Sequence, residues 1–406
     1  MLDGLKGGPR PEGWRGDGTF VATLGLLLAI TPMAVDMYLP ALPSIGRSLG
    51  ADQDQVQLSL SGFFLAFAAG QLVWGPAGDR FGRRVPSLAG LLLFVVGSIG
   101  CWAAGDALVL AAWRVVEAFG AASVTVLARA MVRDVFDRDR SASVLSLMML
   151  VMGAAPMFAP IVGSQILKVA DWRMVFLVLA ALALVSLVPL ARQPETLPVA
   201  RRRSAAFGSV AGAYLVLFND RRYLGYVAAG AGMLGAMFAY ISGTPFIYIE
   251  LFGVGPDMFS LLFGLNVAGM MGSSYLNSRF VLRLGSDRVL RIGLVASVVF
   301  ALALVVFGGS GAYGLAGVVV PLFLFLSCMG LVGANAMAGA LADHPQIAGA
   351  ASALSGFAQF AVGAVAGMVV AARADGTPGP MCQTILVLAI GGAALHFLLV
   401  KPVARR

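Results

Sequence analysis

The stretch PSLAGLLLFVVGSIGCWAAG, residues 86–105, spans 20 positions without a charged side chain. An α-helix rises 1.5 Å per residue, so about 20 apolar residues cross the hydrocarbon core of a lipid bilayer. This stretch therefore predicts a membrane-spanning helix, and its length sets the scale on which the rest of the chain can be divided.

Twelve stretches of this kind follow one another along the 406 residues. They cover residues 20–41, 57–77, 86–105, 107–129, 143–166, 172–190, 223–245, 258–278, 288–308, 312–335, 347–371 and 381–400. Hydrophobic residues make up 59% of the chain and charged residues 12%, against roughly 45–50% and 25% in soluble domains. This composition excludes a soluble globular protein and predicts an all-α membrane protein with twelve transmembrane helices.

The longest polar stretch, residues 191–222, separates six predicted helices from six. Because a folded domain needs at least about 50 residues, no soluble catalytic domain fits between the helices. Two six-helix halves are typical of transporters that rock around a site at the bilayer midplane. The predicted organisation is a cytoplasmic tail at 1–19, a six-helix bundle at 20–190, a cytoplasmic linker at 191–222, a second six-helix bundle at 223–400 and a cytoplasmic tail at 401–406.

The net charge of +8 reflects where the 28 Lys and Arg residues stand along the chain. With the N-terminus placed in the cytoplasm, 23 of the 28 fall in cytoplasmic segments. The exceptions are Arg47, Lys168, Arg173, Arg373 and, within a predicted helix, Arg114. This asymmetry follows the positive-inside rule and predicts that both termini are cytoplasmic. The asymmetry also accounts for the positive net charge, so no nucleic-acid partner is expected.

Cysteine and histidine are scarce. The cysteines Cys101, Cys328 and Cys382 all fall in predicted spans, and the only imidazoles belong to His344 and His396. Neither set has the spacing of metal ligands. We therefore expect no metal site, no disulfide framework and no cofactor.

An acidic residue, Asp36, lies inside the first predicted helix, in the run AVDMYLPALP at 34–43. Insertion scales put Asp at a helix centre at about +2.5 to +3.5 kcal/mol, so a chain without use for this charge would lack it. A carboxyl group that binds and releases a proton couples transport to a proton gradient. One proton crossing about 100 mV and one pH unit supplies roughly 3.7 kcal/mol, enough for about a 500-fold gradient of a neutral solute. We therefore expect Asp36 to be the leading proton site; the alternative is an acid at the outer interface that is wetted by water or caps a neighbouring helix.

Arg114 and Glu117 stand three residues apart and share one face of the fourth predicted helix. Arg114 lies about seven residues, or roughly 10 Å, from the outer end of that helix, similar to the expected depth of Asp36. Arg114 and Asp36 can therefore pair if their helices touch. Glu117 is either a second proton-handling acid or a structural partner that neutralises Arg114, and both interpretations stay open.

Several polar, aromatic and Met residues of the predicted spans are candidates for a substrate cavity. Linings of this mixed kind adapt to varied ligands. For each residue the alternative is ordinary helix packing. The candidates are Met37, Tyr38, Tyr240, Phe246, Asn266, Asn335 and Gln359.

The stretch GPAGDRFGRR, residues 75–84, resembles the signature between helices 2 and 3 of the major facilitator superfamily. Four more segments are similar to drug-resistance antiporters of the bicyclomycin and chloramphenicol resistance (Bcr/CflA) type. They are DMYLPALP (36–43), RVVEAFGAA (114–122), ARAMVRDVF (128–136) and GAAPMFAPIVG (153–163). The resemblance spans the entire chain. It implies twelve helices, alternating access, and proton-driven export of drug-like compounds.

The resemblance also implies roles for single residues. Arg114 looks like the basic residue of the helix 4 proton relay, and Asp79 is expected to brace the end of helix 2 against the N-terminus of helix 11. The gating motif comprises Gly75, Gly78, Asp79, Arg80, Gly82, Arg83 and Arg84. The antiporter motif of helix 5 comprises Gly153, Pro156, Pro160 and Gly163.

The chain departs from the family pattern at three positions. Glu117 stands where the helix 4 motif commonly has Gln, and Ala155 replaces the usual Gly before Pro156. Leu28 occupies the place where some multidrug relatives carry another acid about two turns before Asp36.

These observations predict a proton-coupled antiporter that exports small amphipathic drugs, such as phenicol- or bicyclomycin-like compounds, across the bacterial cytoplasmic (inner) membrane. The expected partners are a small-molecule substrate, protons and the lipid bilayer, and the expected state is a monomer energised by the proton gradient. The alternative is a proton-coupled symporter, or an exporter, of a native metabolite such as a sugar, nucleoside or amino acid derivative. No nucleophile–base pair or metal cluster in the sequence points to a membrane-embedded enzyme.

Overall fold

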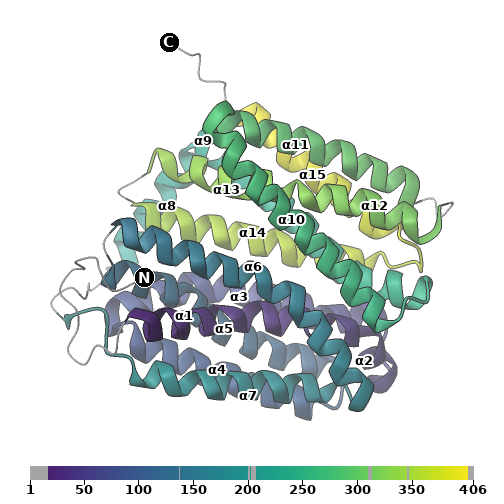
Figure 1. The fold of residues 1–406 in the computed structure, drawn as a ribbon, viewed down its shortest axis with the longest axis horizontal. Helices are drawn as coiled ribbons and strands as arrows, with labels where there is room; N and C mark the ends of the chain where they lie inside the picture. Colours follow the sequence, from purple (N-terminus) through teal and green to yellow (C-terminus); the bar gives the residue numbers. More distant parts are fainter. Residues whose placement is uncertain are drawn as a thin grey trace. The chain divides into compact units, whose positions relative to one another are not determined.

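The computed structural model describes residues 17–136, 138–199, 202, 207–309, 313–344 and 347–400, and these residues form helices and no strand (Figure 1). Eleven helical segments among them are long and apolar enough to cross a membrane. Helix α6 (Arg138–Val169) covers the remaining predicted segment, 143–166. The predicted all-α membrane fold is therefore confirmed. Most of the predicted tail at 1–19, up to residue 16, and the predicted tail at 401–406 lie outside the described residues.

The chain divides into two units, of which the first comprises residues 1–51 and 65–206. Within it, α4 packs against α5 and α7, and α1 packs against α5, α6 and α7. Its elements are α1 (Asp17–Asp36), the 3-10 turn η1 (Leu39–Ala41), α2 (Leu42–Leu49), most of α3 (Gln53–Phe81), α4 (Arg84–Ala103), α5 (Ala107–Val135), α6 and α7 (Arg173–Arg192).

The first helix ends earlier than its hydropathy predicts. The sequence predicts one helix over 20–41, whereas α1 ends at Asp36 and is followed by η1 and α2. Pro40 and Pro43 have no backbone N–H and cannot continue the hydrogen bonding of the preceding helix. Asp36 consequently stands at the C-terminal end of α1 and not inside a continuous helix.

Glycines allow α4 and α5 to approach each other closely. A Cβ atom on Gly97 would lie 2.5 Å from the backbone nitrogen of Glu117, and one on Gly120 would lie 2.5 Å from the carbonyl oxygen of Gly90. Real Cβ atoms do not come this close, so larger residues would push the helices apart. Small residues bring helices together in this way within membranes. The tight α4–α5 contact fixes the position of Glu117.

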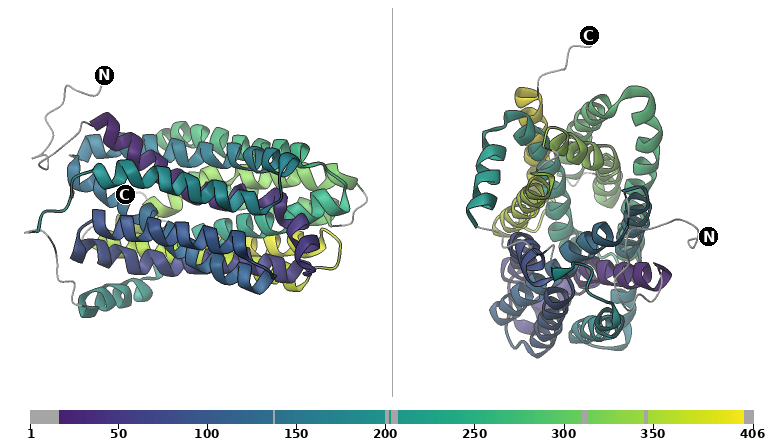
Figure 2. Two further views of the ribbon diagram at one scale, coloured as in Figure 1. Left: turned by 90° about the horizontal axis from the view of Figure 1, so that it is seen from below. Right: turned by 90° about the vertical axis from the view of Figure 1, so that its left-hand side faces the viewer.

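The second unit comprises residues 52–64 and 207–406. Helix α9 packs against α13, α14 and α15, and α10 packs against α12 and α13; within each unit the long helices run alongside one another (Figure 2). Its elements are the first turns of α3, α8 (Phe207–Asn219), α9 (Arg221–Pro245), the π-helical turn η3 (Phe246–Leu251), α10 (Pro256–Leu284), α11 (Ser286–Ala303), the π-helical turn η4 (Leu304–Gly308), α12 (Gly314–Ser327), α13 (Met329–Ala342), α14 (Ala348–Ala372) and α15 (Gly379–Leu399).

The predicted linker at 191–222 is not wholly irregular. Helix α8 lies inside it and groups with the second unit, whereas residues 191–199 group with the first. Residues 200, 201 and 203–206 of this linker lie outside the described part of the chain. The sequence did not predict α8, because a helix of 13 residues is too short to register as a membrane span.

Candidate proton-coupling and gating sites

A buried ion pair joins two residues of α5. Arg114 Nη1 lies 2.6 Å from Glu117 Oε2, and both side chains are fully buried. Ser98 of α4 donates a hydrogen bond from its hydroxyl to the other carboxylate oxygen, Glu117 Oε1, at 2.8 Å. Both oxygens of Glu117 therefore have a partner, and the carboxylate neutralises Arg114 in this conformation. Whether Glu117 also handles a proton stays a prediction.

Arg114 also reaches the end of the first helix. Its Nη1 atom donates a hydrogen bond of 3.1 Å to the carbonyl oxygen of Ala34. The last carbonyls of an α-helix lack partners within the helix and carry partial negative charge, so a guanidinium is favourable there. The guanidinium carbon also lies 4.7 Å from the centre of the Tyr38 ring and 5.8 Å from that of Phe176 on α7. Arg114 thus links α5 to α1 and α7.

Asp36 stands two residues after Ala34 in the chain and does not join the Arg114–Glu117 ion pair. It is the last residue of α1 and is 4% exposed. Across the described residues it forms no ion pair and accepts no side-chain hydrogen bond. The pairing of Asp36 with Arg114 that the sequence suggests is absent, because the guanidinium engages Glu117 and Ala34 instead. Burying an ionised carboxylate without a partner is costly, so the charge state of Asp36 depends on its surroundings.

The residues after Asp36 pack against the expected antiporter motif. Met37 and Tyr38 are fully buried. A Cβ atom on Gly163 of α6 would overlap the backbone of Met37, so glycine is needed there for the two segments to touch. A Cβ atom on Gly153 would have no neighbouring atom within 4 Å. Pro156 and Pro160 both lie within α6.

The substrate-binding candidates of the second unit do not form one group. Asn266 Nδ2 donates to the Tyr240 hydroxyl at 3.1 Å, and these two candidates lie together. Asn335 Nδ2 instead donates to Asn277 Oδ1 at 2.7 Å. Asn266 and Asn277 stand eleven residues apart on α10, or about 16 Å along its axis, so the two pairs lie at different depths.

The other two candidates of this unit lie elsewhere. Gln359 of α14 faces α9, because a Cβ atom on Gly230 would lie 3.1 Å from Gln359 Nε2. Phe246 lines a pocket formed by η3, α14 and α15. The described residues contain no cluster of three or more His, Cys, Asp or Glu side chains that could hold a metal ion.

Carboxylates hold the loop between α3 and α4. The gating motif runs from the last turns of α3 through this loop, which contains Gly82 and Arg83, to Arg84 at the start of α4. Arg83 Nη1 lies 2.6 Å from Asp79 Oδ1, and Arg83 Nε lies 2.9 Å from Asp134 Oδ2 near the end of α5. Burial opposes the charge of Arg83, but its interactions with Asp134 and Asp79 outweigh this effect and raise the pKa of Arg83 above its ordinary value. The bracing of helix 11 by Asp79 concerns both units and stays a prediction.

Glu195, which sequence reasoning missed, holds the same loop. Its carboxylate accepts hydrogen bonds from the backbone nitrogens of Arg83 and Arg84, at 2.7 and 3.1 Å, and so caps the N-terminus of α4. Gly82 has a φ of 90°, and a Cβ atom there would overlap the Glu195 carboxylate. Glycine is therefore required at position 82 for both conformation and space. Arg84 also donates to the carbonyl oxygen of Ala191 in the last turn of α7, so the end of α7 and the segment after it are both attached to this loop.

Replacing Glu195 by Gln is expected to lower the free energy of unfolding by about 0.5–2 kcal/mol, the range for a lost N-cap. An amide has only one acceptor oxygen and would place its NH₂ group against a backbone N–H. Thermal unfolding of the purified protein in detergent measures the change. Asp54→Asn, which removes an exposed acid of α3, is the matched control. Unchanged stability of the Gln variant would contradict the capping role.

Charged groups also meet at the start of α9 in the second unit. Asp220 caps this helix through the backbone nitrogens of Arg222 and Tyr223, and its Oδ2 atom lies 2.7 Å from His344 Nε2. Burial opposes ionisation of Asp220, but the hydrogen bonds from His344 and the two amides outweigh it and hold its pKa below the usual range. Arg222 adds an ion pair of 3.0 Å with Asp343. The α13–α14 connection is thereby tied to α9.

Comparison with known proteins decides the family. The sequence model of the Major Facilitator Superfamily matches residues 24–368 of this chain. The chain belongs to the major facilitator superfamily. This membership makes it a multi-pass membrane transporter of small molecules and not an enzyme, as the sequence predicted.

Individual relatives of this superfamily agree with the motifs. The chain is 34% identical over 395 residues to the bicyclomycin resistance protein homolog of Haemophilus influenzae, covering 93% of this chain and 96% of the relative. It is 28% identical to the chloramphenicol resistance protein of Pseudomonas aeruginosa, over 80% of this chain and 77% of that protein. The predicted membership of the Bcr/CflA type is therefore confirmed.

Among solved structures, the crystal structure of a D-xylose-proton symporter matches with a TM-score of 0.75 and 15% identity, covering 94% of this chain and 97% of that chain. At this identity the likeness shows the major facilitator fold alone.

Proposed function

We propose that this chain is a proton-coupled antiporter that exports small amphipathic drugs across the bacterial cytoplasmic membrane by alternating access. It acts as a monomer with both termini in the cytoplasm, and the proton gradient is its energy source. The names of two relatives, which refer to bicyclomycin and chloramphenicol resistance, support this substrate class. The distribution of Lys and Arg supports the orientation.

The observation that carries the proposal is the environment of Asp36. Its carboxyl group is buried at the end of α1, two residues beyond the carbonyl that holds Arg114. Because Glu117 already neutralises Arg114, Asp36 has no ion-pair partner among the residues that the structure describes. A conformation that wets the end of α1, or that turns Arg114 toward Asp36, stabilises the ionised carboxylate; the present one does not. Proton binding is thereby linked to conformation, as antiport requires.

Growth of an efflux-deficient bacterium tests the proposed function. Cells expressing the wild-type chain are compared with vector controls across phenicols, bicyclomycin, quinolones and lipophilic cations. We expect the chain to raise the inhibitory concentration of at least one phenicol- or bicyclomycin-like compound. Absence of protection against every compound, with membrane expression confirmed, would contradict drug export and favour transport of a native metabolite. Counterflow assays with sugars, nucleosides and amino acids would then identify it.

A further inference from the structure

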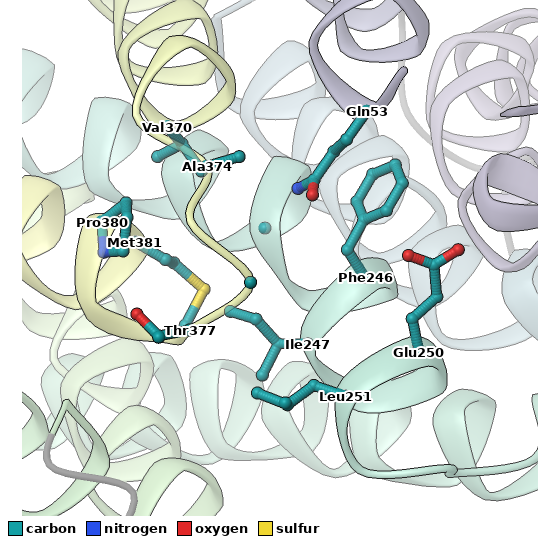
Figure 3. A pocket seen from close by; sticks show the side chains of 12 residues that line it. Gln53, Phe246, Ile247, Glu250, Leu251, Val370, Ala374, Thr377, Pro380 and Met381 are labelled. Carbon is teal, nitrogen blue, oxygen red and sulfur yellow. The ribbon is translucent and has the colours of Figure 1, made fainter. Parts of the chain in front are cut away.

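A pocket of about 250 Å³ opens within the second unit, between η3, α14, the α14–α15 connection and the first turn of α3 (Figure 3). Most of its lining is apolar, and Gln53 and Thr377 add neutral polar groups. Glu250 contributes the one charged side chain among the lining residues. The apolar part comes from Phe246, Ile247, Leu251, Val370, Pro380 and Met381.

The chain segments that line this pocket all lie at helix ends on the same predicted side of the membrane. Gln53 begins α3, η3 follows the C-terminal end of α9, and residues 374–381 connect the end of α14 to the start of α15. In the proposed orientation these are the ends that face away from the cytoplasm. The pocket is therefore reached from outside the cell.

The π-helical turn η3 places an acid beside an aromatic ring. Phe246 and Glu250 are four residues apart on this turn, and Figure 3 shows the Glu250 carboxylate on one side of the Phe246 ring and the Gln53 amide on the other. Pro245 directly precedes the turn. Single π-helical turns are frequent at functional sites, because they re-aim side chains within a helix.

Glu250 is free to meet a ligand. In the part of the chain that the structure describes, no ion pair or side-chain hydrogen bond engages its carboxylate. The basic residue of the nearby connection, Arg373, donates instead to Gln383 at 2.7 Å. Thr377 donates to Asp375 through its hydroxyl and its amide, and these hydrogen bonds hold the pKa of Asp375 below its usual range. The carboxylate of Glu250 is therefore the only charged group among the residues that line the pocket, and no cationic side chain lines it.

This combination selects a particular ligand chemistry. A carboxylate attracts a positive charge, the face of an aromatic ring attracts a quaternary ammonium group, and apolar walls favour a hydrocarbon substituent. An anion would be repelled by the Glu250 carboxylate and would find no cationic side chain among the lining residues. A neutral compound would form no ion pair with Glu250.

We propose that this pocket binds a monovalent organic cation with an aryl or short alkyl substituent, through Glu250 and Phe246. The proposal rests on the proposed function, because the orientation given there places the pocket on the outer side of the membrane. It deepens that function by naming a class of compound that the transporter holds at its outer end.

Protection of an introduced cysteine tests the proposal. Leu251 lines the pocket and is 46% exposed, so Leu251→Cys places an accessible thiol in it, whereas the native Cys101, Cys328 and Cys382 are buried. Intact cells are treated with a membrane-impermeant maleimide, with and without benzyltrimethylammonium as the probe. We expect labelling from outside and a concentration-dependent slowing of it by the probe.

Paired variants in the Leu251→Cys background assign the charge. Glu250→Gln is expected to raise the half-protecting probe concentration about fivefold, the upper end for an exposed ion pair. Asp54→Asn removes an equal charge from the first turn of α3, does not line the pocket, and should leave protection unchanged. Phe246→Ala should weaken protection as well. The labelling rate without probe reports whether each variant folds.

The contrary outcomes are distinguishable. Labelling only after permeabilisation would overturn the proposed orientation and the outer position of the pocket. Labelling from outside without protection by the probe would overturn the cation site and leave drug export untouched. Equal protection with Glu and Gln at position 250 would overturn the role of the carboxylate.

Discussion

Replacing Asp36 by Asn is expected to abolish uphill drug efflux while leaving folded protein in the membrane. Asn has nearly the shape of Asp but does not ionise, so it cannot take up and release a proton during transport, and the drug can no longer be moved against its gradient. The loss is large, because one proton sustains about a 500-fold gradient of a neutral solute. Drug accumulation in energised cells, with and without a protonophore, measures it. Undiminished uphill efflux by the Asn variant would contradict the role of Asp36.

A matched control separates coupling from structure. Asp106 caps the N-terminus of α5 by accepting from the backbone nitrogens of Leu108 and Val109, at 3.0 and 2.9 Å. Asn caps helices as well as Asp does, so Asp106→Asn should keep both stability and efflux. Asp36→Glu, which restores a carboxyl group, should retain part of the activity that Asp36→Asn loses.

Replacing Arg114 by Gln is expected to destabilise the folded protein by about 3–5 kcal/mol, the cost of leaving a buried charge without its partner. Glu117 would keep the hydrogen bond from Ser98 but lose the guanidinium, in a site where neither side chain reaches solvent. The carbonyl of Ala34 would also lose its donor. Thermal unfolding in detergent and the yield of monodisperse protein measure the effect.

The double variant Arg114→Gln/Glu117→Gln gives the sharper comparison. Replacing both members of a buried ion pair by neutral groups is often close to neutral for stability. We therefore expect the double variant to recover most of the stability that Arg114→Gln loses, while transport stays low because Arg114 no longer holds the end of α1. Wild-type stability of Arg114→Gln alone would show that the pair does not hold the bundle together.

Hydropathy predicted the order of the membrane-spanning segments, because the bilayer imposes a length of apolar chain on each span. Hydropathy did not predict where helices that extend beyond the bilayer end. The predicted span 107–129 continues in α5 to Val135, through Arg129 and Arg133, since a helix does not stop at the membrane surface. It also missed the break after Asp36, which depends on prolines and not on polarity.

Local spacing predicted one part of the candidate site and not the rest. Arg114 and Glu117 share a helical face at i and i+3, and they form the ion pair. Spacing could not show that Glu117 and Ala34 would take the guanidinium in place of Asp36. The Glu195 cap joins residues more than a hundred positions apart, and no pattern along the chain connects them.

The central claim is that Asp36 carries the coupled proton. Purified protein in liposomes loaded with a pH-sensitive dye tests it, with an imposed gradient of a phenicol or of bicyclomycin as the only driving force. The account predicts drug-driven proton movement in the opposite direction with the wild type and none with Asp36→Asn at equal protein content. Proton movement by Asp36→Asn at the wild-type rate would contradict it.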